Sequence, residues 1–204
     1  MPILISHSIL ENINKEIDSC TDSFYVISAF CKETLIKYFD SKLSEQVKDK
    51  KLIVRMRPDD ILSGATDLSL YPYCKEHGWQ MLFRLDLHAK TYVFDDMRCI
   101  IGSANATGNG LSVGGVGNYE MATTCNIVPE DRRAINNLFA SLLLISSKCA
   151  KNSDIVPVPP GNIITTSASY KISLNLLIVS EIFPNLVISC LYVNECVFID
   201  QAFW

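Results

Sequence analysis

The amino-acid sequence predicts an α/β fold in which a mixed β-sheet is flanked by helices, with a small β-rich extension at the C-terminal end. Short apolar runs alternate with helical patterns over the first 85 residues, and this alternation favours parallel strands with covering helices. Two short strands then flank a tight turn, which is typical of an antiparallel hairpin. Because 49% of the 204 residues are hydrophobic, the chain can also form a substantial core.

The first half of the chain shows this alternation clearly. Residues 23–30 (SFYVISAF) are aromatic and β-branched, as in a buried strand, whereas residues 32–49 carry apolar side chains at helical spacing. Thr66 is a candidate N-cap and Gly78 a candidate stop for a further helix. The expected elements are helices over 7–18, 32–49 and 66–78, strands over 23–30, 51–56 and 79–85, and a loop at 58–64.

The second half is expected to hold a hairpin, one more strand and a long helix. The helix begins with a proline and two acidic residues, which suit a helix N-terminus. The expected elements are strands over 89–94, 98–103 and 119–127, a turn at Asp95–Met97, and a helix over 129–148. A stretch rich in proline and polar residues follows, and we interpret it as a linker. The expected organisation is a domain over 1–151, a linker over 152–162, and a β-rich extension or the start of a further domain over 163–204.

Composition narrows the class of protein. The net charge of −4 argues against bulk electrostatic binding of nucleic acid but leaves room for a local basic cleft. The eight cysteines are scattered without a CxxC pair, which predicts reduced thiols in a cytoplasmic protein and no zinc framework. The N-terminus lacks the features of a signal peptide. The apolar stretch 170–193 is interrupted by charged residues and a proline, so no membrane span or membrane partner is expected.

Several polar residues lie near one end of the expected hairpin. Residues two apart in a strand share a face, so His88 and Lys90 point the same way. In the hairpin, His88 falls opposite Ser103 or Ala104, at about 5 Å. Asn105 follows just beyond. The ammonium, hydroxyl and carboxamide groups that gather around the imidazole all donate hydrogen bonds to oxygen, as a phosphate site requires.

These residues form a longer pattern, H-x-K-x4-D-x6-G-S-x-N. The pattern resembles the signature of the phospholipase D superfamily. The sequence segments LHAKTYVFDD, IIGSANAT and NYE are most similar to those of nuclease and restriction-endonuclease-like members. The resemblance covers about residues 1–150, and it implies the fold predicted above and an activity on phosphodiesters. The matching positions are His88, Lys90, Asp95, Gly102, Ser103 and Asn105.

The resemblance also implies a mechanism. His88 attacks phosphorus and forms a phospho-histidine intermediate, a second histidine protonates the leaving oxygen, and water then releases the phosphate. Lys90 and Asn105 neutralise and orient the non-bridging oxygens, so neither a metal ion nor another cofactor is implied. Neither His7 nor His77 is followed by a lysine two places on. The resemblance therefore implies a homodimer in which two copies of His88 share one site.

Five further or supporting roles are expected. The resemblance implies that a downstream acid orients the nucleophilic imidazole, and Glu120 is the match. Asp95 belongs to the catalytic motif, yet its place at the turn favours bracing of the hairpin over contact with substrate. Ser103 either contacts substrate or serves only the turn. Arg55 and Arg57 end a parallel strand, where open α/β sheets bind ligands, and they either bind nucleic-acid phosphate or point into solvent.

Three functions remain open on the sequence. The first is a metal-independent nuclease, with DNA as the expected partner and restriction of foreign DNA as a possible use. The second is a phospholipase or phosphatidyltransferase that acts on lipid phosphodiesters. The third is a non-catalytic dimer module that binds DNA. The single motif and the residues around it favour the nuclease. The presence of both His88 and Lys90 favours catalysis over binding alone.

Overall fold

The structure of the chain, a computed structural model, describes the backbone of residues 3–151 and nearly all side chains up to residue 140. The expected linker and C-terminal extension, residues 152–204, lie outside the described residues. The chain divides into two compact units, Met1–Phe139 and Ala140–Trp204. The first unit carries the sheet and all the residues of the motif.

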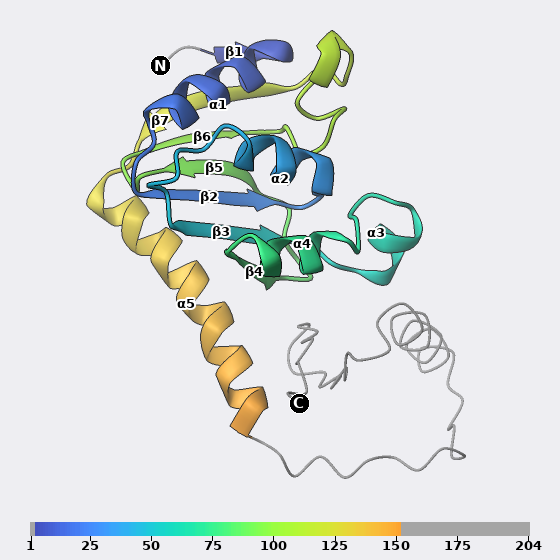
Figure 1. The fold of residues 1–204 in the computed structure, drawn as a ribbon, viewed down its shortest axis with the longest axis vertical. Coiled ribbons are helices and arrows are strands. Elements are labelled where there is room, and N and C mark those ends of the chain that lie inside the picture. The colour runs from blue at the N-terminus through green and yellow to red at the C-terminus, as the bar shows by residue number, and fades with distance from the viewer. Residues whose placement is uncertain (1–2, 152–204) are drawn as a thin grey trace. The chain divides into compact units, whose positions relative to one another are not determined.

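The first unit is built on a mixed sheet of seven strands with helices flanking it (Figure 1). Two strand pairs, β2 with β3 and β3 with β4, are parallel, and the other four pairs are antiparallel. The fold class predicted from the sequence is therefore confirmed. In spatial order the strands are β1 (Ile3–Ile5), β7 (Met121–Asn126), β6 (Arg98–Gly102), β5 (Lys90–Phe94), β2 (Ser23–Ser28), β3 (Asp49–Val54) and β4 (Trp79–Phe83).

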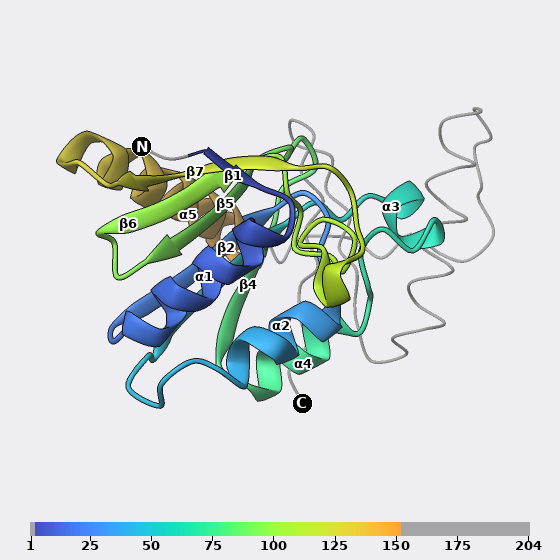
Figure 2. The same ribbon diagram turned by 90° about the horizontal axis from the view of Figure 1, so that it is seen from above.

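An aromatic cluster forms the core between the sheet and its helices. The rings of Phe39, Trp79 and Phe94 lie with their centroids 5.6, 5.9 and 5.3 Å from that of Phe24. Helices α1 and α2 lie together along this face of the sheet (Figure 2). The helical segments are α1 (His7–Ser19), α2 (Glu33–Asp40), α3 (Pro58–Leu62), α4 (Leu70–Glu76), the 3-10 turn η1 (Val113–Gly115) and α5 (Pro129–Lys151).

The predicted helix over 32–49 is wrong in its second half, because α2 ends at Asp40. The N–H groups of Lys42 and Leu43 both donate to the carbonyl of Phe39, which tightens the chain into a turn. The Asp40 carboxylate meanwhile accepts hydrogen bonds from side chains of β3 and β4. These tertiary contacts outweigh the apolar spacing that favoured a longer helix.

Two further boundaries differ from the prediction and one agrees. The expected loop at 58–64 contains the short helix α3, whose start is capped because the Asp60 carboxylate accepts the Arg57 N–H at 3.3 Å. Thr66 does not cap α4; it is buried before the helix begins, and its hydroxyl donates to a backbone carbonyl. Gly78 stops α4 as predicted, with a φ of 73° that favours glycine.

The strand β1 was not predicted, because three residues are too few to show an alternating pattern. It pairs with β7 in an antiparallel manner at one border of the sheet. The other predicted strands are present with ends shifted by a few residues, and so are the helices expected over 7–18 and 129–148. The buried apolar runs therefore located the sheet correctly.

The strand directions bring distant segments to one edge of the sheet. Because β5 runs antiparallel to β2, the C-terminal ends of β2 and β3 lie beside the N-terminal end of β5. The same alternation adds the C-terminal end of β6 and the N-terminal end of β7. Most of the motif residues lie where the chain enters or leaves these strands, so the topology gathers them at this edge.

Candidate active site

His88 and Lys90 stand at the start of β5, on the edge described above. Lys90 is the first residue of the strand and pairs with Ser28 at the end of β2. The register between β5 and β6, continued past the strand ends, sets His88 opposite Ala104, which is one of the two positions that the sequence predicted. Because β5 is the fourth of the seven strands, the pair lies at the end of a central strand and not on a strand at the side of the sheet.

The side chains of this pair have opposite environments. The His88 imidazole is exposed, and among residues 3–140 it has no hydrogen-bond or ion-pair partner. Lys90 is only 7% exposed, and its Nζ donates to the His88 carbonyl at 2.7 Å. Burial lowers the pKa of Lys90, the charge of Arg55 lowers it further, and the charge of Glu120 opposes the shift. A fixed amine is therefore bonded to the backbone of the residue that carries the accessible imidazole.

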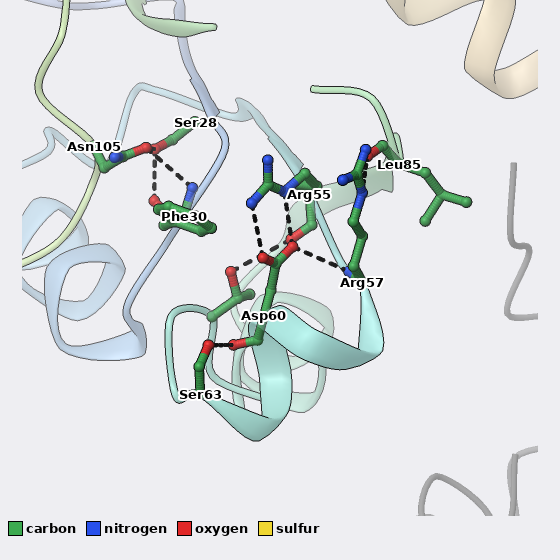
Figure 3. A network of polar contacts seen from close by, with 9 residues as sticks. Ser28, Phe30, Arg55, Arg57, Asp60, Ser63, Leu85 and Asn105 are labelled. Carbon is green, nitrogen blue, oxygen red and sulfur yellow. Dashed lines mark hydrogen bonds and ion pairs between the residues drawn. The ribbon is translucent and has the colours of Figure 1, made fainter. Parts of the chain in front are cut away.

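Asn105 is held from the β2 side of the site (Figure 3). Its Oδ1 accepts the Phe30 N–H at 3.1 Å and the Ser28 hydroxyl at 3.5 Å. The next residue, Ala106, donates its N–H to the same hydroxyl oxygen at 2.9 Å. Because Oδ1 is engaged in this way, the Nδ2 group of the carboxamide is the one left to donate to a ligand.

The glycine-rich loop over residues 106–118 follows Asn105 and folds back onto it. A Cβ at Gly110 would lie 2.4 Å from the Asn105 carbonyl oxygen, so glycine is required for this close approach. Leu111 is fully buried, and the Asn118 N–H donates to the Asn109 carbonyl at 2.8 Å. The loop is therefore a folded support for Asn105 rather than an open connection.

Glu120 enters the site just before β7. Its carboxylate is buried and accepts the Ser103 hydroxyl on one oxygen and the Asn118 Nδ2 group, at 3.2 Å, on the other. The Ser103 oxygen in turn accepts the Met121 N–H at 3.1 Å, so this hydroxyl is committed to the junction of β6 and β7. No hydrogen bond joins Glu120 to His88 within residues 3–140, and the orienting role of Glu120 stays a prediction.

Gly102 allows Ser103 and Glu120 to meet. A Cβ at Gly102 would lie 2.3 Å from the Met121 carbonyl oxygen and 2.6 Å from the Ala122 Cα. A side chain at this position would therefore push β6 and β7 apart. The motif therefore needs glycine at this position because the two strands approach each other closely here.

Asp95 lies at the other end of the hairpin from His88. It adopts a φ of 52° in the turn, and its carboxylate accepts the N–H groups of Thr21, Asp22 and Ser23 at 3.0, 2.8 and 2.9 Å. Burial alone would raise the pKa of Asp95, but the hydrogen bonds from Ser23 and its neighbours outweigh burial and lower it. Asp95 thus ties the turn to the start of β2, away from the other motif residues.

Arg55 and Arg57 follow β3 at the site's edge of the sheet (Figure 3). Arg55 donates from Nε and Nη2 to the two carboxylate oxygens of Asp60, at 2.8 Å each, and its guanidinium lies 4.7 Å from the Phe30 ring centroid. Arg57 is exposed, and its Nε donates to the Leu85 carbonyl at 2.6 Å. The contact between Asp60 and Arg55 was not predicted from the sequence. An acid five residues after an arginine, in the first turn of a Pro-Asp-Asp helix, was the available signal.

Comparison with known proteins decides the family. A family model described as "Cardiolipin synthase, PLD-like domain" matches residues 13–142. The chain belongs to the phospholipase D-like family. The superfamily that the motif predicted is therefore confirmed, and the match covers every strand of the sheet except β1. No curated protein matches the chain.

Several solved structures share the phospholipase D-like fold. NucT from Helicobacter pylori is 16% identical with a TM-score of 0.50, and the match covers 70% of this chain and 96% of NucT. Nuc, a phospholipase D family member from Salmonella typhimurium, is 16% identical with a TM-score of 0.52, covering 70% and 93%. Phosphatidylserine synthase from Haemophilus influenzae Rd KW20 is 16% identical with a TM-score of 0.51, covering 67% of this chain but 35% of the synthase. At this identity the likeness shows the fold alone.

The phospholipase D-like site offers an imidazole, an amine and an amide at one edge. Within the part of the chain that the structure describes, no group of three or more His, Cys, Asp or Glu side chains is placed to hold a metal ion. No helix there is long and apolar enough to cross a bilayer. The donors present suit the oxygens of a phosphate group, and the exposed imidazole suits attack on its phosphorus.

Proposed function

We propose that the chain is a phosphodiesterase that cleaves nucleic acid, DNA foremost, without a metal ion and through a phospho-histidine intermediate. The observation that carries the proposal is that His88 exposes its imidazole while the buried Lys90 amine is bonded to the His88 backbone carbonyl, at an edge where Asn105 adds a donor. Imidazole is nucleophilic near neutral pH. Ammonium and amide groups stabilise the charge that develops on phosphate oxygens in the transition state.

The proposed reaction has two displacements at phosphorus. A ring nitrogen of His88 attacks, a P–N bond forms, and the bond from phosphorus to the leaving oxygen breaks. A second imidazole donates a proton to that oxygen. Water then attacks phosphorus, the P–N bond breaks, and the proton lost by water passes to the second imidazole. Both histidines return to their starting states.

The second imidazole is proposed to come from a second copy of the chain. His7 begins α1, and His77 follows α4 with its ring stacked on Tyr73 at 4.0 Å. Neither is followed by the motif lysine. One chain therefore holds the nucleophilic imidazole, and a two-fold axis beside His88 would supply the second imidazole that acts as acid and base.

An exposed apolar face of the sheet supports this dimer. Ile5 pairs with Met121, and Ile101 pairs with Thr123 two residues along β7, so these side chains share one face. Ile5, Ile101 and Met121 are 39%, 48% and 47% exposed. Met121 is also bonded to Ser103 through its backbone, so the apolar face reaches the site. A second copy that covers this face would bring two sites together.

The basic residues at the edge favour a polyanion over a single lipid phosphate. Arg57 is exposed and anchored beside the segment that leads to His88, and Arg55 lies close enough to affect Lys90. Arginines placed along a site suit successive backbone phosphates. The family description, which names a lipid enzyme, favours a lipid phosphodiester as the second candidate. A non-catalytic DNA-binding dimer is the third.

The cysteines support a reducing compartment such as the cytoplasm. The five cysteines up to residue 140 are all free thiols. Burial raises the pKa of both Cys20 and Cys74 to about 12, so these thiols stay protonated and unreactive. Such thiols behave as small apolar core residues, and they need no oxidising environment.

The first experiment is a cleavage assay in excess EDTA on DNA and on RNA. Wild type, His88→Ala and the control His77→Ala are compared, because His77 is also exposed but lies outside the motif. We expect cleavage that survives chelation, persists in His77→Ala and falls by at least about 10³-fold in His88→Ala. Absence of cleavage of either polymer, with release of a lipid headgroup instead, would favour the lipid candidate.

A mixing experiment tests the shared site. Wild-type and His88→Ala chains are co-expressed with different tags, and the mixed dimers are purified. If both imidazoles act in one reaction, mixed dimers are as inactive as dimers in which both copies carry His88→Ala. Mixed dimers that keep half of the wild-type activity would show that each copy acts alone.

A further inference from the structure

Asp60 holds the guanidinium of Arg55 in one orientation (Figure 3). Both of its carboxylate oxygens accept from Arg55 at 2.8 Å. Asp60 is itself fixed: it is 6% exposed, and its backbone carbonyl accepts the N–H groups of Ala65 at 2.7 Å and Thr66 at 3.3 Å. A bidentate bond to an immobile acid orients an arginine more tightly than a single bond does.

Phe30 connects Arg55 to the other side of the site. Its ring lies 4.7 Å from the guanidinium carbon, and its N–H donates to the Asn105 Oδ1 at 3.1 Å. Arginine has five N–H donors, of which Asp60 engages two. Figure 3 shows the third guanidinium nitrogen pointing away from Asp60. Arg55 therefore keeps donors for a ligand while its position is set by two neighbours.

The charge of Arg55 acts on the lysine of the motif. The end of β3, which Arg55 follows, and the start of β5, where Lys90 lies, both pair with the last residue of β2. The charged groups that act on Lys90 are Arg55 and, from the start of β7, Glu120, and His88 precedes it on its own segment. The positive charge of Arg55 lowers the pKa of Lys90, which means that the two cations repel each other. Asp60 offsets this repulsion because it neutralises Arg55 at close range.

We propose that Asp60 is a positioning residue of the active site, which holds Arg55 as a phosphate-binding group beside Lys90. The inference rests on the proposed function of this site. Arg55 binds a non-bridging oxygen of the phosphate that His88 attacks, and Asp60 touches no substrate. Without Asp60 the guanidinium rotates more freely, and its charge is no longer compensated next to Lys90.

The test compares Asp60→Asn with a matched control, Asp40→Asn. Asp40 pairs with Lys50 at 2.8 Å at the other end of β3, and the two ion pairs are similarly buried. Hydrolysis of an aryl phosphodiester is measured well below each variant's unfolding temperature. We expect Asp60→Asn to raise KM about tenfold with kcat within about twofold of wild type, and Asp40→Asn to change neither. An unchanged KM in Asp60→Asn overturns the inference, whereas partial recovery in Asp60→Glu supports it.

Binding of inorganic phosphate separates this inference from the proposed function. Calorimetry on the same three chains needs no turnover. Phosphate bound about tenfold more weakly by Asp60→Asn but equally by Asp40→Asn supports the inference. Equal binding by wild type and Asp60→Asn overturns it. A wild-type chain that binds phosphate but cleaves no phosphodiester contradicts the proposed function alone.

The pH profile is a readout that a merely structural role would not move. Lys90 must be charged to bind phosphate, and burial and Arg55 lower its pKa. Arg55→Gln removes a positive charge, so the alkaline fall of kcat/KM moves to higher pH. Asp60→Asn leaves Arg55 uncompensated, so the fall moves to lower pH. Movement in the same direction in both variants, or in neither, contradicts the inference.

Discussion

The strand β3 carries a buried ion pair near each end, and the two pairs look alike. Lys50 pairs with Asp40 near the start of the strand, and Arg55 pairs with Asp60 just past its end, both at 2.8 Å. The side chains are 16% and 14% exposed in the first pair and 16% and 9% in the second. Distance and burial therefore do not distinguish the two pairs.

What differs is where the remaining hydrogen-bonding groups go. Asp40 also accepts the Tyr73 hydroxyl at 2.7 Å and the Trp79 indole N–H at 3.0 Å, so its capacity is spent on joining α2 to α4 and β4. In the other pair the cation keeps donors and lies near Lys90. We therefore expect the pair whose acid joins several elements to contribute mainly to stability, and the pair whose cation keeps open donors at the site's edge to serve a ligand.

The largest expected effect is on stability, at the Asp40 end. Asp40→Ala leaves Lys50, Tyr73 and Trp79 without their shared acceptor, so we expect the free energy of unfolding to fall by about 3 kcal/mol. Asp60→Ala should cost less, since fewer side chains depend on it. Denaturant unfolding of both variants measures the difference, and kcat/KM of Asp40→Ala should stay near wild type. A larger stability loss in Asp60→Ala would remove the distinction between the two ends.

Asp95 offers a second test of a carboxylate that serves the fold. Asp95→Asn weakens the bonds from Thr21, Asp22 and Ser23, and we expect about 2 kcal/mol of destabilisation near neutral pH. Because the folded pKa of Asp95 is lowered, its contribution is present above the unfolded pKa and is lost as pH falls through the folded pKa. Wild type and variant should therefore converge in stability on acidification. A difference that is constant from pH 7 to strong acid would contradict the assignment.

Ser103 tests the site from the β6 side with a smaller effect. Ser103→Ala removes the hydroxyl that binds Glu120, and if Glu120 orients His88, kcat should fall about tenfold. Stability should fall by only about 1 kcal/mol, because Glu120 keeps its bond from Asn118. Ser103→Thr retains a hydroxyl and is the control. An unchanged kcat in Ser103→Ala would show that Glu120 needs no help from this residue.

The sheet was predictable because its signals are local. Buried strands such as 23–28 and 90–94 carry short runs of aromatic and β-branched residues, and each can be identified from its own residues. The errors lie where distant contacts decide. α2 stops at Asp40 because of partners in β3 and β4, and the short β1 exists because β7 is there to pair with it.

The site was predictable to the same extent and for the same reason. One motif within the hairpin holds His88, Lys90 and Asn105, so their spacing in the sequence is enough to identify them as candidate site residues. Asp60 is close to Arg55 in sequence, but its proposed role depends on the fold, which brings the ends of β3 and β2 and the start of β5 to one edge of the sheet. Local spacing therefore predicted the family and which residues gather at the site, and only the folded chain shows what surrounds them.

Arg57 provides the smallest expected effect and the sharpest view of the substrate. Its guanidinium is exposed and anchored to Leu85 by one bond. Arg57→Gln should raise KM about threefold for a polynucleotide at low salt and leave KM for an aryl phosphodiester unchanged, because only the polymer has a neighbouring phosphate. At about 0.5 M salt the difference should disappear, since screening removes exposed charge interactions. Equal changes for both substrates would instead place Arg57 at the reacting phosphate, with Arg55.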